Sequence, residues 1–73
     1  MAIIGKIINE GFDNINTREG SVLCDITHNK EYFQIRTYAM GEMDRKHGSK
    51  QNIQLTKEKA IQIRKYLDEF INQ

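Results

Sequence analysis

Two tyrosines, an amide and an arginine occupy every second position of the stretch YFQIRTYAM, residues 32–40. They are Tyr32, Gln34, Arg36 and Tyr38. If the stretch is a β-strand, these side chains project from one face, whereas Phe33 and Ile35 project from the other. Flat rings stack on bases and cationic groups contact phosphates, which is the combination that binds single-stranded nucleic acid without reading its sequence. The pattern therefore predicts a binding face, with packing of the tyrosines inside the protein as the alternative.

Positive charge is concentrated next to this stretch. The chain has a formal net charge of only +1, yet residues 45–65 hold seven basic residues and a single acid, Glu58. A basic region on a nearly neutral chain favours a polyanionic partner, whereas a solvated loop and helix face is the alternative interpretation of the same charges. With the cations near the predicted strands included, the candidate phosphate contacts are Lys6, Lys30, Arg45, Lys46 and Lys50.

Catalytic and metal-binding patterns are weak throughout the sequence. The two histidines, His28 and His47, are far apart, and neither has cysteines or carboxylates at the spacing of metal ligands. Ser49 follows His47 in a polar stretch without a third group to orient a base. No glycine-rich phosphate loop is found. We therefore expect no catalytic residues, no metal, no cofactor and no enzymatic activity.

The chain is short, and this limits how it can be stabilised. Its 73 residues suit one domain spanning residues 1–73, and a chain of this length buries only about 60% of its unfolded surface. The single cysteine, Cys24, excludes an internal disulfide, so oligomerisation is the remaining way to complete the core. No stretch approaches the ~20 apolar residues of a membrane span, and residues 1–12 do not resemble a signal peptide. We expect a cytoplasmic protein, associated with the nucleoid if the source is bacterial.

Hydrophobic alternation and turn residues predict four strands before one helix. The predicted strands cover residues 2–8, the two arms of a hairpin over 21–40, and residues 51–55, with polar connections at 9–20 and 41–50. We place the hairpin turn at Asn29-Lys30, because asparagine suits the first position of a tight turn. The resulting pairs are Ile26–Phe33, Cys24–Ile35, Thr27–Tyr32, Asp25–Gln34 and Leu23–Arg36. This register gathers the apolar pairs on one face, so Cys24 is expected to be a small buried residue.

The end of the chain has the pattern of an amphipathic helix. Thr56 is a good N-cap for a helix over residues 57–73. At about 100° per residue, an apolar stripe forms one side of that helix. It consists of Ala60, Ile63, Tyr66, Leu67, Phe70 and Ile71. Ile61 lies among the polar positions and is a candidate subunit contact.

The order of these motifs resembles a known family. The run from Tyr32 to Leu67 is similar to the C-terminal domain of the transcriptional coactivator called positive cofactor four. The matching motifs are Ile35-Arg36-Thr37-Tyr38, the loop ending in Gly48-Ser49-Lys50, Ile53-Gln54-Leu55, the helix from about Lys57, and Ile4-Gly5-Lys6 near the start. The similarity covers roughly residues 22–70, and the order and spacing of these short motifs carry it.

The resemblance implies an α+β fold, in which a curved four-stranded antiparallel sheet is followed by one C-terminal helix. It also implies a homodimer formed through the helices, with the sheets and loops holding single-stranded DNA or unwound duplex. By position, Arg36 is the best matched DNA contact, Lys6 and Lys30 correspond to phosphate contacts, and Lys50 corresponds to basic residues before the last strand. The expected dimer interface consists of Ile61, Ile63, Tyr66, Leu67 and Phe70.

Two functions remain open from the sequence. In the first, the chain is a non-catalytic single-stranded DNA binding protein with a role in transcription, replication or repair. Its predicted contacts are Lys6, Lys30, Tyr32, Gln34, Arg36, Tyr38, Arg45, Lys46 and Lys50. In the second, the same fold is a small protein-interaction module that regulates a DNA-processing partner. Asp25 replaces a basic residue of the family, Thr27 an aromatic one and Ala39 a tryptophan, which favours the second function because carboxylates repel phosphate.

Overall fold

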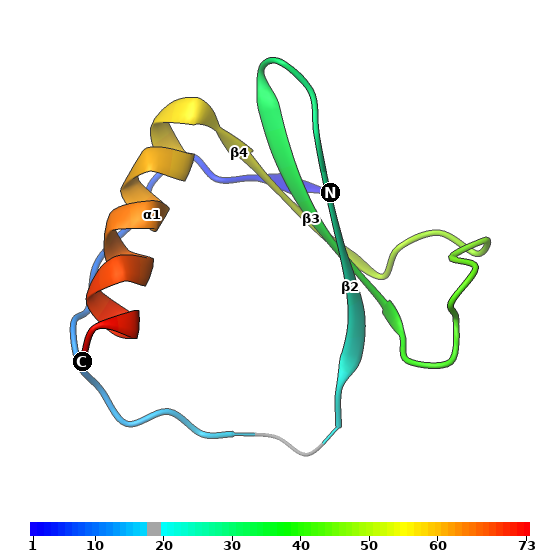
Figure 1. Cartoon of the computed structure of the whole chain (residues 1–73), viewed down its shortest axis with the longest axis horizontal. Helices are drawn as coiled ribbons and strands as arrows, with labels where there is room; N and C mark the ends of the chain where they lie inside the picture. Colours follow the sequence, from blue (N-terminus) through cyan, green and yellow to red (C-terminus); the bar gives the residue numbers. More distant parts are fainter. Residues whose placement is uncertain (18–19) are drawn as a thin grey trace.

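Four strands precede one helix along the chain (Figure 1). The computed structural model describes residues 1–17 and 20–73, so part of the predicted 9–20 connection, Arg18 and Glu19, lies outside the described residues. The elements are β1 (Ala2–Ile3), β2 (Val22–His28), β3 (Tyr32–Ala39), β4 (Gln51–Thr56) and α1 (Lys57–Ile71). The α+β fold class and the order of the elements expected from the sequence are confirmed.

The strands form one mixed sheet in the order β1-β4-β3-β2. β2, β3 and β4 are antiparallel neighbours, but β1 lies parallel to β4, with Ala2 opposite Ile53. The expectation of a wholly antiparallel sheet is therefore wrong. The first strand is also shorter than the predicted residues 2–8. The backbone N–H of Ile4 still donates to the Gln54 carbonyl at 3.0 Å, and pairing ends at Gly5, a residue type that weakens strands.

The β2–β3 hairpin turns one residue later than predicted, with Lys30 and Glu31 at its centre. The side-chain oxygen of Asn29 accepts hydrogen bonds from the backbone N–H groups of Glu31 and Tyr32, at 2.9 and 2.8 Å. The backbone N–H of Asn29 donates to the Tyr32 carbonyl at 2.9 Å. Asn29 therefore lies just before the two central residues of the turn, and its side chain closes the turn through these hydrogen bonds.

This later turn moves the strand pairing by two residues. Every side chain stays on its predicted face, since the side-chain period of a strand is two. The observed pairs include Ile26–Ile35, Cys24–Thr37, Thr27–Gln34, Asp25–Arg36 and Leu23–Tyr38. The predicted pairs are therefore wrong in register. The correction has a chemical consequence, because it puts the carboxylate of Asp25 directly opposite Arg36.

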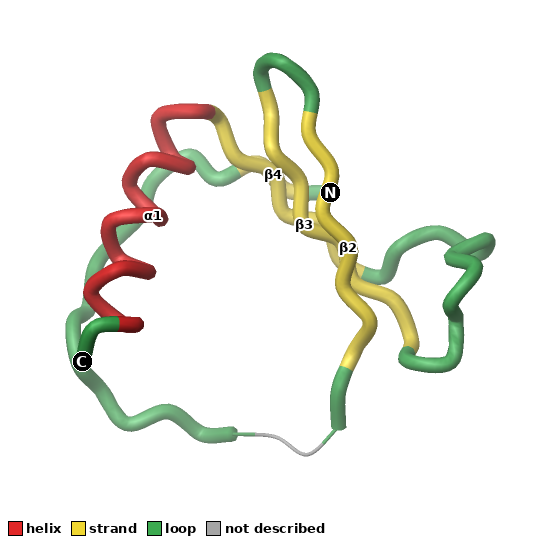
Figure 2. Tube along the Cα trace, viewed as in Figure 1, coloured by secondary structure: helices red, strands yellow, loops and turns green. Residues whose placement is uncertain are grey.

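Helix α1 begins as predicted and packs on the sheet with its first turns. The hydroxyl of Thr56 accepts a hydrogen bond from the N–H of Lys59 at 3.3 Å and so caps the helix. Leu55 is only 4% exposed, and it lines one shallow cavity with Phe33 and Ala60. The rest of the helix diverges from the strands (Figure 2). The small core of a single copy therefore lies at the junction of β3, β4 and the start of α1.

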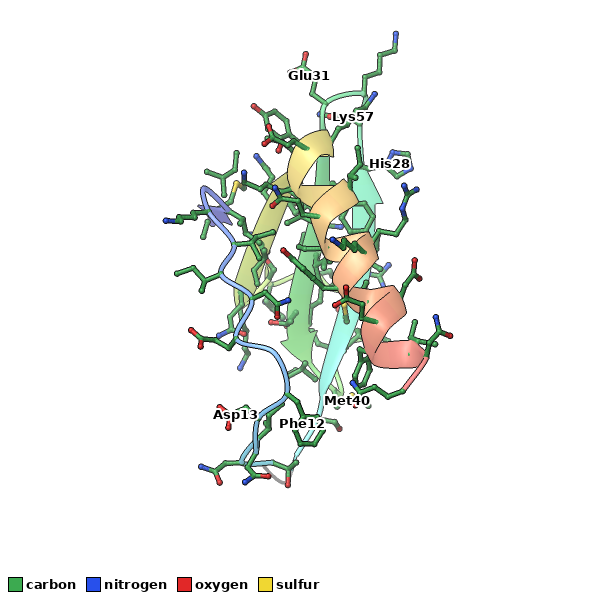
Figure 3. All side chains as sticks on the ribbon, turned by 90° about the vertical axis from the view of Figure 1, so that its left-hand side faces the viewer. Phe12, Asp13, His28, Glu31, Met40 and Lys57 are labelled. Atoms are coloured by element: carbon green, nitrogen blue, oxygen red, sulfur yellow. The ribbon has the colours of Figure 1, made fainter. Side chains whose placement is uncertain are left out.

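The N-terminal segment extends the structure along the far half of α1. Phe12 lines a cavity together with Tyr66 and Phe70 of the helix. Figure 3 shows α1 in front of the sheet, with Glu31 and Lys57 at one end of the molecule and Phe12 at the other. In the described part of the chain, no helix is long and apolar enough to cross a membrane.

Much apolar surface is exposed in a single copy. The chain exposes 6693 Å², whereas a compact protein of 8.6 kDa exposes about 4,700 Å². Its radius of gyration is 14.2 Å, against about 11 Å for a compact chain of this length. Cys24, expected to be buried, is exposed, as is Ile26 beside it on the same face. The reason is that, among the described residues, α1 contacts β3 and β4 but does not reach β2.

Candidate nucleic-acid interface

The strand register sorts the side chains of β2, β3 and β4 onto two faces. The inner face, which α1 covers in part, carries Val22, Cys24, Ile26, His28, Phe33, Ile35, Thr37, Ala39, Gln51, Ile53 and Leu55. The outer face carries Leu23, Asp25, Thr27, Tyr32, Gln34, Arg36, Tyr38, Asn52, Gln54 and Thr56. The alternation within residues 32–39 therefore places the four strand residues predicted as contacts on one face, as the sequence indicated.

The end of the outer face near the hairpin turn is open and polar. Tyr32 is 36% exposed, and the side-chain amide of Gln34 donates to the Oε1 of Gln54 at 3.5 Å. These three residues and Thr27 line a shallow depression. Amides and hydroxyls donate and accept hydrogen bonds, and an exposed ring offers a surface on which a base can stack. This end of the face has the chemistry for uncharged contacts to a nucleic acid.

The other end of the outer face holds an ion-pair cluster, the Asp25 clasp, formed by Asp25, Arg36 and Arg45. Arg36 donates from Nε to Oδ1 of Asp25 at 2.7 Å and from Nη2 to Oδ2 at 3.0 Å. Arg45 reaches the same carboxylate from the loop of residues 40–50, with its Nε 3.3 Å from Oδ2. Two-point guanidinium–carboxylate contacts are among the strongest and most directional hydrogen bonds in proteins. A single carboxylate therefore holds Arg36 of this face together with Arg45 of the loop.

The charges of the Asp25 clasp shift the ionisation of its members. The hydrogen bond from Arg36 holds the pKa of Asp25 below its ordinary value, against the opposing effect of desolvation. In return, the hydrogen bond to the Asp25 carboxylate raises the pKa of Arg36. Both groups are therefore charged at neutral pH.

Tyr38 is not an open stacking surface. It is only 4% exposed, so the expectation that its ring is exposed on the binding face is wrong, and the alternative of a packed tyrosine holds for this residue. Burial raises the pKa of its hydroxyl, and a hydrogen bond with the Asp25 carboxylate raises it further. Tyr38 lies at the end of the face to which the 40–50 loop returns, since Arg45 contacts Asp25 there. This loop projects on the side of the sheet opposite α1 (Figure 1).

The predicted lysine contacts are exposed but distributed around the sheet. Lys30 lies in the hairpin turn, and Lys50 lies just before β4, where its backbone N–H donates to the Thr37 carbonyl at 2.8 Å. Lys46 is in the 40–50 loop, with its Nζ 4.0 Å from Oδ2 of Asp44. Because β3 has eight residues, the two ends of the outer face are about 25 Å apart. These cations therefore flank the face at both ends and do not form one cluster.

Lys6 is the predicted contact that the fold separates most clearly from the others. It is exposed and follows β1, outside any strand, and β1 borders β4 at the edge of the sheet opposite β2. The predicted strand over residues 2–8 would have placed this lysine on the sheet itself. Since that strand ends early, Lys6 is not positioned by the strand ladder.

The residues predicted for the dimer interface differ in their exposure. Ile63 and Tyr66 are half-buried, whereas Leu67 and Phe70 are exposed where α1 diverges from the strands. Ile61 is exposed as well, but it lies on the polar side of the helix. The apolar stripe of α1 is therefore only partly covered by its own chain.

Two features of the outer face were not predicted from the sequence. Asn52 and Gln54 belong to it, and the alternation with Ile53 and Leu55 was the signal that could have placed them there. The Asp25 clasp was missed because the turn was predicted one residue too early. The side chain of Asn29, which often closes turns, was the available signal for the later turn.

Neither a metal site nor a known relative assigns a function to these surfaces. The described residues contain no group of three or more His, Cys, Asp or Glu side chains that could hold a metal ion. Comparison of the chain with protein-family models, with curated proteins and with solved structures finds no match. The resemblance to the positive cofactor four family stays a prediction, so the function has to be argued from the site.

Proposed function

We propose that this protein binds single-stranded nucleic acid, DNA or the separated strands of an unwound duplex, as a homodimer and without catalysis. The observation that supports the proposal best is the composition of the outer face, which α1 leaves uncovered. This face combines the exposed ring of Tyr32, the amides of Gln34 and Gln54, and the guanidinium group of Arg36, and Arg45 of the 40–50 loop joins it at Asp25. Such a surface can stack on bases and contact phosphates. The corresponding roles are in transcription, replication or repair, in the cytoplasm, with association to the nucleoid if the source is bacterial.

The exposed apolar surface supports the homodimer. A single copy exposes about 2,000 Å² more than a compact protein of its mass, and a stable interface of standard size buries about 800 Å² on each partner. Leu67 and Phe70 on α1, with Ile26 and Ile53 on the inner face, contribute to this exposed surface. A second copy supplies an identical apolar surface, and a twofold axis brings the two together.

A fluorescence anisotropy titration tests the binding function. The probes are a labelled oligothymidylate of about twenty nucleotides and a duplex of the same length. We expect tighter binding to the single strand, with an affinity that falls steeply from low to physiological salt because bound phosphates release counterions. Absence of binding at low salt would refute the proposal.

A pair of double variants tests the site. Arg36→Ala with Lys50→Ala removes two cations from the outer face and its border, and we expect affinity to fall by about tenfold or more. Arg64→Ala with Lys65→Ala removes the same charge from the exposed side of α1 and is the matched control. Equal losses in the two variants would mean that only net charge matters. Unchanged affinity in the first variant, with circular dichroism showing an intact fold, would exclude the outer face.

A protein-interaction module that regulates a DNA-processing protein is the second candidate. The Asp25 clasp favours it, because an internal carboxylate already neutralises cations that phosphates would otherwise contact. Tyrosine and arginine are also common among the residues that dominate protein–protein binding. The same titration separates the two candidates, since this one predicts no binding to either oligonucleotide at low salt.

A further inference from the structure

The Asp25 clasp has the geometry of an anion site that is already occupied. Two guanidinium groups converge on one carboxylate, Arg36 through two hydrogen bonds of 2.7 and 3.0 Å and Arg45 at 3.3 Å. A carboxylate and a phosphodiester each present two oxygens to a guanidinium in the same forked arrangement. The Asp25 carboxylate thus fills the position that a backbone phosphate would take between these arginines.

We propose that Arg36 and Arg45 form a phosphate site that Asp25 occupies in the free protein, so that a nucleic-acid phosphate binds there by displacing the Asp25 carboxylate. This inference rests on the proposed function and deepens it. It names the group of the ligand that the arginines contact, and it names the internal competitor that the ligand has to replace.

The exposure of the three side chains supports such an exchange. The side chain of Asp25 is 17% exposed, whereas those of Arg36 and Arg45 are 33% and 45% exposed. The side chains of both arginines are therefore more accessible to a ligand in solution than the side chain of Asp25. The arginines can keep one set of oxygen partners while they release the other, so neither guanidinium group has to become unpaired during the exchange.

The backbone at Arg45 supports it as well. Arg45 has a φ of +55°, in the left-handed region that residues other than glycine seldom adopt. Its N–H donates to the Glu42 carbonyl at 3.1 Å, which places it in a turn of the 40–50 loop. Because this conformation is unfavourable, the contact with Asp25 helps to maintain it. Release of Asp25 would remove this restraint on the backbone of Arg45.

A specificity follows from this competition. A single small anion gains little, because it exchanges one ion pair for another at the same arginines. A strand that also contacts Lys30, Lys50 and the open end of the face adds interactions that Asp25 cannot replace. The Asp25 clasp therefore favours ligands with several phosphates over free phosphate.

Two variants that each remove one carboxylate test the proposal. Asp25→Asn keeps the size of the side chain but weakens its hold on the arginines. Asp44→Asn removes the same charge from the neighbouring loop, where the nearest cation is Lys46 at 4.0 Å. With labelled oligothymidylate, we expect Asp25→Asn to bind about tenfold tighter than the wild type and Asp44→Asn at most about twofold tighter. The salt dependence of Asp25→Asn should also steepen by roughly 0.7 for each phosphate newly contacted.

The outcomes separate this inference from the proposed function. Equal gains in the two variants, or no gain in Asp25→Asn, would overturn the displacement while leaving wild-type binding to support the function. Binding by Asp25→Asn alone, with none by the wild type, would support the phosphate site and refute the function of the natural protein. Adding Arg45→Gln to Asp25→Asn should remove most of the gain, and retention of the full gain would overturn the role of Arg45.

A measurement on the wild-type protein keeps the proposal falsifiable if Asp25→Asn does not fold. The Nε–Hε groups of Arg36 and Arg45 give NMR signals that report their hydrogen-bond acceptor. Addition of oligothymidylate should shift both signals and leave that of Arg64 unchanged. Binding without a shift of either clasp arginine would overturn the displacement of Asp25.

Discussion

The inner face of the sheet leaves Ile26 and Ile53 exposed, because α1 reaches only part of it, whereas the outer face shields Asp25 and Tyr38 although it is the polar side. Within one copy, side chains at the centre of the apolar face are thus exposed to solvent, whereas those at one end of the polar face are shielded from it. The exposure of a side chain in a single copy therefore does not distinguish a ligand-binding surface from apolar surface that a second copy would bury. Each face has to be interpreted by the kind of partner that its side chains can still bind.

The two faces lack different kinds of partner. Burial of apolar area is favourable by about 25 cal/mol per Å² and has no directional requirement, so the inner face can drive association of two copies. The outer face instead depends on directional hydrogen bonds between guanidinium groups and oxygens. We infer that the inner face sets the assembly, and that the outer face sets what the assembly binds.

The largest expected effect comes from placing a charge on the inner side of the molecule. Leu67→Asp puts a carboxylate in the apolar stripe of α1, where the proposed dimer would bury it. An unpaired buried charge costs several kcal/mol, and a single copy has little core of its own. We expect loss of the dimer and of most cooperative structure, measured by sedimentation velocity and circular dichroism at the same protein concentration.

Lys65→Asp is the matched control for that change. It introduces the same side chain two residues earlier, on the exposed polar side of α1. It should leave the dimer intact and change the melting temperature little. A wild-type protein that melts cooperatively as a monomer, or a Leu67→Asp variant that still dimerises, would contradict the assignment of the inner face.

The two tyrosines of the outer face should respond in opposite ways. Tyr32 is exposed and Tyr38 is buried, so Tyr32→Ala should weaken oligonucleotide binding by roughly tenfold with little loss of stability. Tyr38→Ala should instead lower the melting temperature by roughly 10 °C, because removal of its buried ring leaves a cavity. Anisotropy titrations and thermal melts of both variants measure the two effects.

Phenylalanine substitutions refine this comparison. Tyr32→Phe keeps the ring and should keep most of the binding. Tyr38→Phe keeps the ring but loses the hydroxyl that meets Asp25, so it should destabilise the fold less than Tyr38→Ala. If Tyr38→Ala weakened binding with no loss of stability, the buried tyrosine would have to become exposed when the ligand binds.

The fold was predictable where local patterns decide it. Alternation in residues 32–39 and the cap at Thr56 specify a strand with two distinct faces and the start of a helix, and both are confirmed. The parallel pairing of β1 was not predictable in this way, since a strand of two residues, Ala2 and Ile3, gives no indication of its partner strand. Non-local pairing depends on what the rest of the sheet leaves unpaired.

The sequence was enough to predict which face of the sheet each site residue lies on, but not whether its side chain is free to contact a ligand. The sequence placed Arg36 and Tyr38 on the polar face correctly, yet one is held by Asp25 and the other is buried. Both outcomes depend on contacts between segments distant in the sequence: Asp25 meets Arg36 through a turn closed by Asn29, and Arg45 returns from a long loop. Alternation with a period of two along a strand indicates to which face a side chain points, but it does not indicate which groups that side chain contacts.

The smallest expected effect concerns acid, and it separates the two faces by pH. Because the folded protein holds the pKa of Asp25 below its ordinary value of 3.8, the Asp25 clasp stabilises the protein above that pH, and this contribution is lost as the pH falls through the lowered pKa. In Asp25→Asn the contribution is absent at every pH. Urea unfolding should therefore show the wild type more stable than Asp25→Asn at about pH 7, with the difference shrinking toward about pH 3.

Asp44→Asn controls for the loss of one carboxylate, and an equal change in that variant would mean that the clasp is not the source. Apolar burial has no such titration, so acid should weaken the clasp before it weakens the apolar contacts of the proposed dimer.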